Sequence, residues 1–207
     1  MKKDTRDLLL EVALELFATK GYHATKVSDV VKKAGVAQGT FYWYFESKEE
    51  IVLKIMAEGR KKLLEVVHSG YRKEEGNIRD MVDSSKRLMK KLLSFASNNR
   101  NLMILLLLKG QGGDEKLRNA ISETLVAIEK EFANNIQRAI ELQMLEDRDC
   151  VEFQAQMLTS LVTGTISRWL FGPMHELNYQ PSLSIDKVVD EMVRYEFFGL
   201  IGQGGRQ

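Results

Sequence analysis

The 207-residue sequence predicts an all-α protein of about nine helices, and three observations support this prediction. Apolar residues recur at i, i+3, i+4 and i+7 in one segment after another, which is the period of an α-helix. Only two prolines occur in the whole chain, so few positions interrupt a helix. Glycines stand where these apolar stripes end, and glycine is the residue that most often closes a helix.

The first expected helix covers residues 5–19 and is closed by Gly21. A short second helix ends at Gly35, and a third helix follows at once. Gly35 can adopt the positive φ that closes one helix and turns the chain sharply into the next. Helix, short glycine-containing turn and helix make up the helix-turn-helix pattern, whose second helix enters the major groove of DNA. The apolar stripe of the second helix consists of Val27, Val30, Val31 and Ala34.

The third expected helix, Gln38 to Phe45, has the sequence QGTFYWYF. Phe41 and Phe45 are four residues apart and can both face a core, which leaves Tyr42 and Trp43 pointing outward. Two helices around a glycine also occur in proteins that never touch nucleic acid. Large aromatic side chains exposed to water usually mark a contact site, so this helix favours the DNA-binding interpretation.

The run AGVAQGTFYWYFESKEEI, preceded by Thr25, Lys26 and the Val30 and Val31 pair, resembles the N-terminal domain of the TetR/AcrR-type transcriptional regulators. The resemblance covers roughly residues 6 to 55. It implies a three-helix helix-turn-helix DNA-binding domain at residues 1–50, fused to a larger helical domain at residues 51–207 that binds an effector and dimerises. Ala37 departs from the family, which often has serine there, so one helix cap and one phosphate contact are lost.

Residue chemistry and the resemblance together indicate the DNA contacts. The carboxamide of Gln38 can pair with adenine, and the tyrosine hydroxyls suit phosphates. Thr25 is expected to cap the second helix, and Lys48 resembles the phosphate-clamping lysine of the family. Alternatively, Lys26 is a solvated charge and Trp43 is a half-buried prop for the next helix. The candidates for DNA binding are Thr25, Lys26, Gln38, Gly39, Thr40, Tyr42, Trp43, Tyr44 and Lys48.

Six further helices are expected after the recognition helix. Ser47 and Glu50 form a capping box that starts the first of them, and Asp114 caps the longest. Gln111 to Gly113 are expected to form a flexible link. The expected ranges are approximately 48–70, 78–95, 102–109, 114–145, 150–171 and 185–200.

The resemblance implies an effector pocket between about residues 52 and 172, and flexible methionines suit an adaptable apolar pocket. It also implies that the last two long helices pair with their copies in a four-helix dimer interface. The alternative for each residue is ordinary core packing. The candidates for effector binding are Met89, Met103, Phe132, Met157 and Trp169, and those for the dimer interface are Leu158, Val162, Gly164, Ile166, Val189, Val193 and Phe197.

Several classes of function have no support in the sequence. His23, His68 and His175 are far apart, and no catalytic, metal-ligand or nucleotide-binding motif occurs. Cys150 is the single cysteine, which suits a reducing compartment. The apolar run from Leu102 to Leu108 is too short to span a bilayer, and no export signal is found. We expect no enzyme activity, no metal, no cofactor and no membrane partner, and a location on DNA in the bacterial cytoplasm.

The first fifty residues carry eight basic and eight acidic side chains, so any basic surface there is local. Specific binding must therefore depend on DNA contacts that each of the two protomers of a dimer makes. We expect a homodimeric repressor that binds a palindromic operator and is released by a small, largely apolar effector. One alternative is a dimeric DNA-binding regulator whose C-terminal domain is controlled by a protein partner or is purely structural. Another is a helical enzyme or lipid carrier with a vestigial helix-turn-helix.

Overall fold

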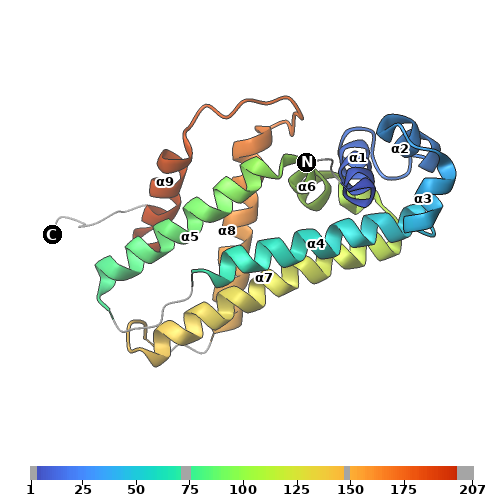
Figure 1. The fold of residues 1–207 in the computed structure, drawn as a ribbon. Coiled ribbons are helices and arrows are strands. Elements are labelled where there is room, and N and C mark those ends of the chain that lie inside the picture. Colours follow the sequence, from blue (N-terminus) through green and yellow to red (C-terminus); the bar gives the residue numbers. More distant parts are fainter. Residues whose placement is uncertain (1–3, 71–75, 147–149, 200–207) are drawn as a thin grey trace. The chain divides into compact units, whose positions relative to one another are not determined.

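The computed structural model describes residues 4–70, 76–146 and 150–199. Within these ranges the ordered elements are all helical and include nine α-helices, which confirms the predicted fold class (Figure 1). The helices are α1 (Thr5–Thr19), α2 (Val27–Ala34), α3 (Gln38–Tyr44), α4 (Lys48–His68), α5 (Ile78–Asn98), α6 (Arg100–Ile104), α7 (Glu115–Glu141), α8 (Val151–Phe171) and α9 (Ile185–Phe198). A π-helical turn, η1 (Leu105–Lys109), and a 3₁₀ turn, η2 (Gly110–Gly112), continue α6.

The chain divides into two compact units. The first comprises Met1–Lys61 and Asn99–Thr124, and the second comprises Lys62–Asn98 and Leu125–Gln207. Helix α6 and the beginning of α7 therefore share a unit with α1, α2 and α3, although a long stretch of sequence separates them. Helices α4 and α7 each contribute residues to both units.

Helix α1 supplies much of the core of the first unit. Leu9, Ala13 and Phe17 on its inner face are fully buried. Asp4 caps the helix, since its carboxylate accepts the N–H of Arg6 at 3.4 Å. Helix α1 contacts α2, α6 and η1, so the helix-turn-helix is built on a well-packed support.

The turn between α2 and α3 has the predicted geometry. Gly35 has a φ of 68°, in the left-handed region that glycine favours. The N–H of Val36 reaches back to the carbonyl of Val31 at 3.1 Å, as expected for a helix closed by this turn.

The expected cap of α2 is wrong. Thr25 is fully buried, and its hydroxyl donates to the carbonyl of Gly21 at 2.8 Å, so the hydroxyl is directed away from the helix that follows. The N-cap position belongs to Lys26, whose N–H donates to the Asp29 carboxylate at 3.1 Å. A threonine satisfied by the preceding turn cannot also cap the next helix.

The predicted apolar helix at residues 102–109 begins earlier and changes geometry midway. It starts at Arg100, widens into the π-helical turn η1, and closes through the 3₁₀ turn η2 instead of a flexible link. The N–H of Gly113 donates to the carbonyl of Gly110 at 2.9 Å, which fixes this turn. The turn is closely packed at Gly110, where a Cβ would lie 2.1 Å from the side chain of Ile121.

Gly110→Ala should therefore destabilise the protein. The added methyl group would also meet the carbonyl oxygen of Leu105 at 2.3 Å, so relief requires movement of backbone. We expect a loss of about 2 kcal/mol or more and a fall in Tm of roughly 4–8 °C in thermal unfolding. Gly112→Ala is the matched control, because a Cβ there meets no atom within 4 Å. Equal Tm values for the two variants would contradict the close packing of Gly110.

The second unit is centred on α5, α8 and α9, and α5 and α9 lie side by side in it (Figure 1). Met89 and Leu93 of α5, and Val193 of α9, belong to its core. Exposed ion pairs border the contact, including Lys86 with Asp190 at 2.7 Å. None of the helices that the structure describes is long and apolar enough to cross a membrane.

Candidate functional site

Helix α3 has one buried side and one strongly exposed side. Phe41 is fully buried and Phe45 is 3% exposed, whereas Trp43 is 84% exposed and Tyr42 51% exposed. The expectation that Phe41 and Phe45 face the core is confirmed. The alternative in which Trp43 is a half-buried prop is wrong, because its indole is almost entirely accessible. Water around so much aromatic surface is unfavourable, so α3 presents a surface suited to a contact.

The remaining candidates on α3 surround this aromatic pair. Gln38 and Gly39 are exposed, and Thr40 and Tyr44 are partly buried. A Cβ at Gly39 would meet no atom within 4 Å, so the backbone is open to a close approach from outside. The absence of a serine at Ala37 has the expected effect, since no side chain caps α3 there.

Lys26, Thr25 and Lys48 come together at the start of α2, but in different roles. Lys26 is exposed, with its side chain outside the fold. The ammonium of Lys48 donates to the carbonyls of Tyr22 at 2.9 Å and of Thr25 at 3.0 Å. Thr25 itself is buried, so of these three residues Lys26 is the one already placed to meet a phosphate.

Local charges fix the starts of α2 and α4. The Lys26 N–H, together with the ammonium of Lys20 at 3.7 Å, holds the pKa of the Asp29 carboxyl below its usual range. The capping box of α4 is present, because Glu50 N–H donates to the Ser47 hydroxyl at 3.1 Å. The Glu50 carboxylate in turn accepts the N–H of Glu46 at 2.5 Å. Both helix starts are therefore defined without any bound ligand.

The five candidate effector residues lie in different surroundings. Met89 and Phe132 are buried in the second unit, and Met103 is buried in the first. Met157 is 60% exposed, and Trp169 is half-buried.

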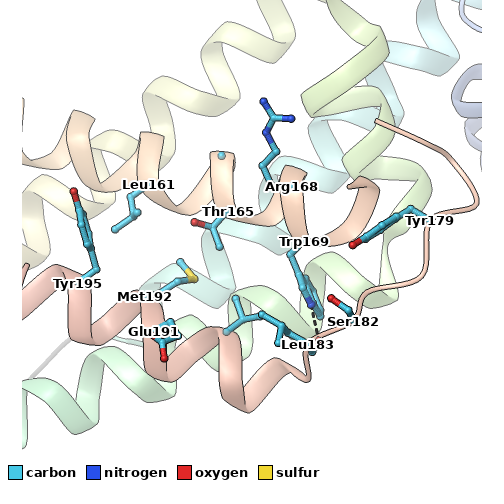
Figure 2. Close-up of a pocket in the computed structure, with 12 residues that line it drawn as sticks. Leu161, Thr165, Arg168, Trp169, Tyr179, Ser182, Leu183, Glu191, Met192 and Tyr195 are labelled. Carbon is cyan, nitrogen blue, oxygen red and sulfur yellow. Dashed lines mark hydrogen bonds between the residues drawn. The ribbon is translucent and has the colours of Figure 1, made fainter. Parts of the chain in front are cut away.

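A shallow groove of about 490 Å³ runs between α8, the segment that follows it, and α9 (Figure 2). Of the effector candidates only Trp169 lines it, and its indole N–H donates to the carbonyl of Leu183 at 2.9 Å. Sequence reasoning missed Tyr179, Leu183 and Tyr195, which also line it. No helical pattern marks the first two, because they lie between α8 and α9.

Most of the candidate dimer residues on α8 and α9 are packed inside the protomer. Gly164 is exposed, and Leu158 and Phe197 are partly buried. The exposed face of α8 instead carries Phe153, which is 61% exposed, and Met157. The apolar stripe that the sequence shows most clearly thus faces the protomer's own core. The buried candidates are Val162, Ile166, Val189 and Val193.

Across the described ranges, no cluster of three or more histidine, cysteine, aspartate or glutamate side chains could hold a metal ion. Cys150 is exposed.

Comparison with known proteins agrees with this geometry. Residues 9–55 match the family model described as "Bacterial regulatory proteins, tetR family". A fatty acid metabolism regulator protein of Bacillus subtilis is 27% identical over 165 residues, which cover 78% of this chain and 81% of that protein.

Two solved structures share the fold over nearly the whole chain. The fatty acid degradation regulator FadR of Bacillus halodurans has a TM-score of 0.79 at 21% identity, and covers 98% of this chain and 100% of its own. FadR of Bacillus subtilis, in complex with stearoyl-CoA, has a TM-score of 0.76 at 22% identity, with 94% and 98% covered.

Proposed function

Because the chain belongs to the TetR family of bacterial transcriptional regulators, we propose that it is a homodimeric repressor that binds a palindromic operator and is released by a small effector. The proposed DNA binding rests on the two sides of α3. Phe41 is fully buried on one side, and Trp43 is 84% exposed on the other. A helix held this firmly by its inner face can enter a major groove without rearranging. We place the protein on DNA in the bacterial cytoplasm.

The proposed contacts divide into positioning and reading. Lys26, Tyr42 and Tyr44 meet phosphates, which fixes the register of the helix on DNA. Gln38 pairs with an adenine edge, and Thr40 reaches a thymine methyl or a phosphate. Trp43 packs on sugar or a thymine methyl, and Gly39 lets the backbone come close.

The proposed dimer places a second copy on the exposed face of α8 and the adjoining surface of α9. Phe153 and Met157 are more than half exposed. Large apolar side chains exposed in this way usually mark a surface that a partner covers. Gly164 is open to a close approach, because a Cβ there meets no atom within 4 Å. Two copies then present their α3 helices to half-sites about 34 Å apart.

The proposed effector is a long-chain acyl-CoA thioester. Its support is the naming of relatives as fatty acid regulators and the stearoyl-CoA complex of one of them. The acyl chain needs an apolar interior, and we propose that Met89 and Phe132, which are buried in the second unit, line it with one flexible and one aromatic side chain. Release requires that acyl-CoA bind one dimer shape better than the DNA-bound shape. In the preferred shape the two α3 helices are too far apart to reach both half-sites.

Selection of bound genomic fragments, followed by acyl-CoA titration of the purified complex, tests this function. We expect a palindromic fragment set, and release of the operator by stearoyl-CoA but not by CoA alone. Stearate distinguishes a requirement for the thioester from a requirement for the chain. Selection of no sequence would contradict the DNA-binding function. Operator binding unaffected by any of the three probes would contradict the effector class and favour control by a protein partner.

A further inference from the structure

Three threonines are buried in the part of the chain that the structure describes, and one of them differs from the other two. The hydroxyl of Thr124 donates to the carbonyl of Ala120 at 2.7 Å, and that of Thr25 donates to the carbonyl of Gly21 at 2.8 Å. The hydroxyl of Thr159 has no hydrogen-bond partner among the described residues, although this residue is only 4% exposed. A buried hydroxyl without a partner has lost its hydration and gained no bond in return, so it lowers the stability of the fold.

Thr159 lies on the apolar stripe of α8 that is buried in the second unit. Ala155 and Val162, four residues before it and three after it, are 1% and 4% exposed. A threonine in a helix can donate to the carbonyl four residues back, as the Thr163 hydroxyl does to Thr159 at 2.7 Å. Within the described ranges Thr159 makes no equivalent bond to Ala155. Its hydroxyl is therefore free to bind a group from outside the chain.

Asn135 of α7 holds a second buried polar atom in the same unit. It lies on the inner stripe of that helix between Phe132, which is 1% exposed, and Ala139, which is 9% exposed. Its amide nitrogen is buried and has no hydrogen-bond partner in the parts of the chain that the structure describes. An amide N–H can only donate, so the missing partner of Asn135 is an acceptor.

The surroundings of these two atoms favour a neutral acceptor over a charged one. No lysine, arginine or histidine is buried within the described ranges, so a carboxylate placed there would have no cation. A thioester or amide carbonyl carries no charge, and it can accept a hydrogen bond from either side chain. Thr159 marks the deeper position of the two, because Asn135 as a whole residue is only partly buried.

We propose that Thr159 and Asn135 bind the polar part of the effector. The hydroxyl of Thr159 donates to the thioester carbonyl of a long-chain acyl-CoA, and the amide of Asn135 donates to an amide carbonyl of its pantetheine arm. The thioester is the polar group next to the acyl chain, so it takes the deeper position. This assignment rests on the proposed effector class, and it adds the residues that select a thioester over a free fatty acid.

Thermal unfolding of the ligand-free protein tests whether the Thr159 hydroxyl is unpaired. Thr159→Val keeps the shape of the side chain and removes the hydroxyl, so Tm should rise by roughly 2–4 °C. Thr124→Val is the matched control, because the hydroxyl that it removes has a partner, and its Tm should fall by roughly the same amount. A Tm for Thr159→Val at or below that of the wild type would overturn the proposal, since the hydroxyl would then already be satisfied.

Equilibrium titration with two CoA compounds, without DNA and below their micellar concentrations, tests the bond to the carbonyl. S-octadecyl-CoA is a thioether with the same chain length as stearoyl-CoA but no carbonyl oxygen. The wild type should bind it about tenfold more weakly than stearoyl-CoA. Thr159→Val should bind both compounds equally, about tenfold more weakly than the wild type binds stearoyl-CoA. Misfolding cannot explain weaker binding by a variant that is more stable than the wild type.

Asn135→Leu has nearly the same shape as the wild-type side chain and tests the second bond. It should weaken binding of both CoA compounds by about tenfold, because both contain the pantetheine arm. The ratio between the two affinities should stay as in the wild type. Stearate should bind the wild type more weakly than stearoyl-CoA does, because its carboxylate would be buried without a cation.

Each bond has its own contradicting result. A wild-type ratio between the two CoA compounds in Thr159→Val overturns the bond to the thioester, and wild-type affinities in Asn135→Leu overturn the bond to the pantetheine arm. Stearate bound as tightly as stearoyl-CoA overturns the selection of a neutral carbonyl. In these cases the wild type still binds stearoyl-CoA, so the proposed effector class stands. A wild type that binds neither CoA compound contradicts the effector class and, with it, the role of Thr159 and Asn135.

Discussion

Replacing Tyr42 and Trp43 together by alanine should reduce operator binding to the level of non-specific DNA. Each contact to DNA contributes about 1–3 kcal/mol, and a dimer loses both contacts in each half-site. The expected loss is therefore about 4 kcal/mol or more, or roughly a thousandfold in Kd. Fluorescence anisotropy with labelled operator and a scrambled sequence measures both the affinity and the specificity ratio.

The fold should survive this double substitution, because both side chains are more than half exposed. Surface substitutions usually change stability by less than about 0.5 kcal/mol, so Tm and dimer state should stay as in the wild type. Met174→Ala removes another exposed apolar side chain, 77% accessible, and should leave operator affinity unchanged. Wild-type affinity in the double variant would remove α3 from the operator interface.

Met157→Glu should dissociate the dimer and thereby abolish operator binding. Symmetry brings the new carboxylate into the interface twice, and each buried unpaired charge costs several kcal/mol. The dimer Kd should rise by about a thousandfold or more. Sedimentation equilibrium gives the mass, and anisotropy should show that a single copy holds only one half-site.

Val126→Glu is the matched control, since it places a glutamate on an exposed apolar position of α7, 46% accessible. It should remain dimeric and bind operator normally. A Met157→Glu protein that sediments as a wild-type dimer would show that the second copy sits on another surface. A monomeric Met157→Glu protein with full operator affinity would show that dimerisation is not needed for binding.

The helix-turn-helix was predictable because its signals are local. Gly35 ends α2 through a positive φ, and Phe41 and Phe45 are close enough in sequence to show their shared face. Helix number followed from the apolar period in the same way. The contacts of Lys48 with the carbonyls of Tyr22 and Thr25, more than twenty residues earlier in the chain, carry no such signal. They depend on which helices pack together, and periodicity does not encode that.

The effector and dimer residues show the limit of hydrophobicity as a guide. Val162 and Ile166 on α8 are buried within the protomer, whereas Phe153 and Met157 on the same helix are exposed. All four read as apolar residues in the sequence. A residue's neighbours in the fold, and not its own polarity, decide whether it is core or surface.

A lysine from a distant part of the chain binds the C-terminal end of helix α1. The ammonium of Lys109 donates to the carbonyl of Thr19 at 2.6 Å, and Lys116 pairs with Glu49 at 2.6 Å. A cation at a helix C-terminus stabilises its exposed carbonyls. A chimera that joins the first fifty residues to the C-terminal domain of another regulator therefore loses the contacts with Lys109 and Lys116.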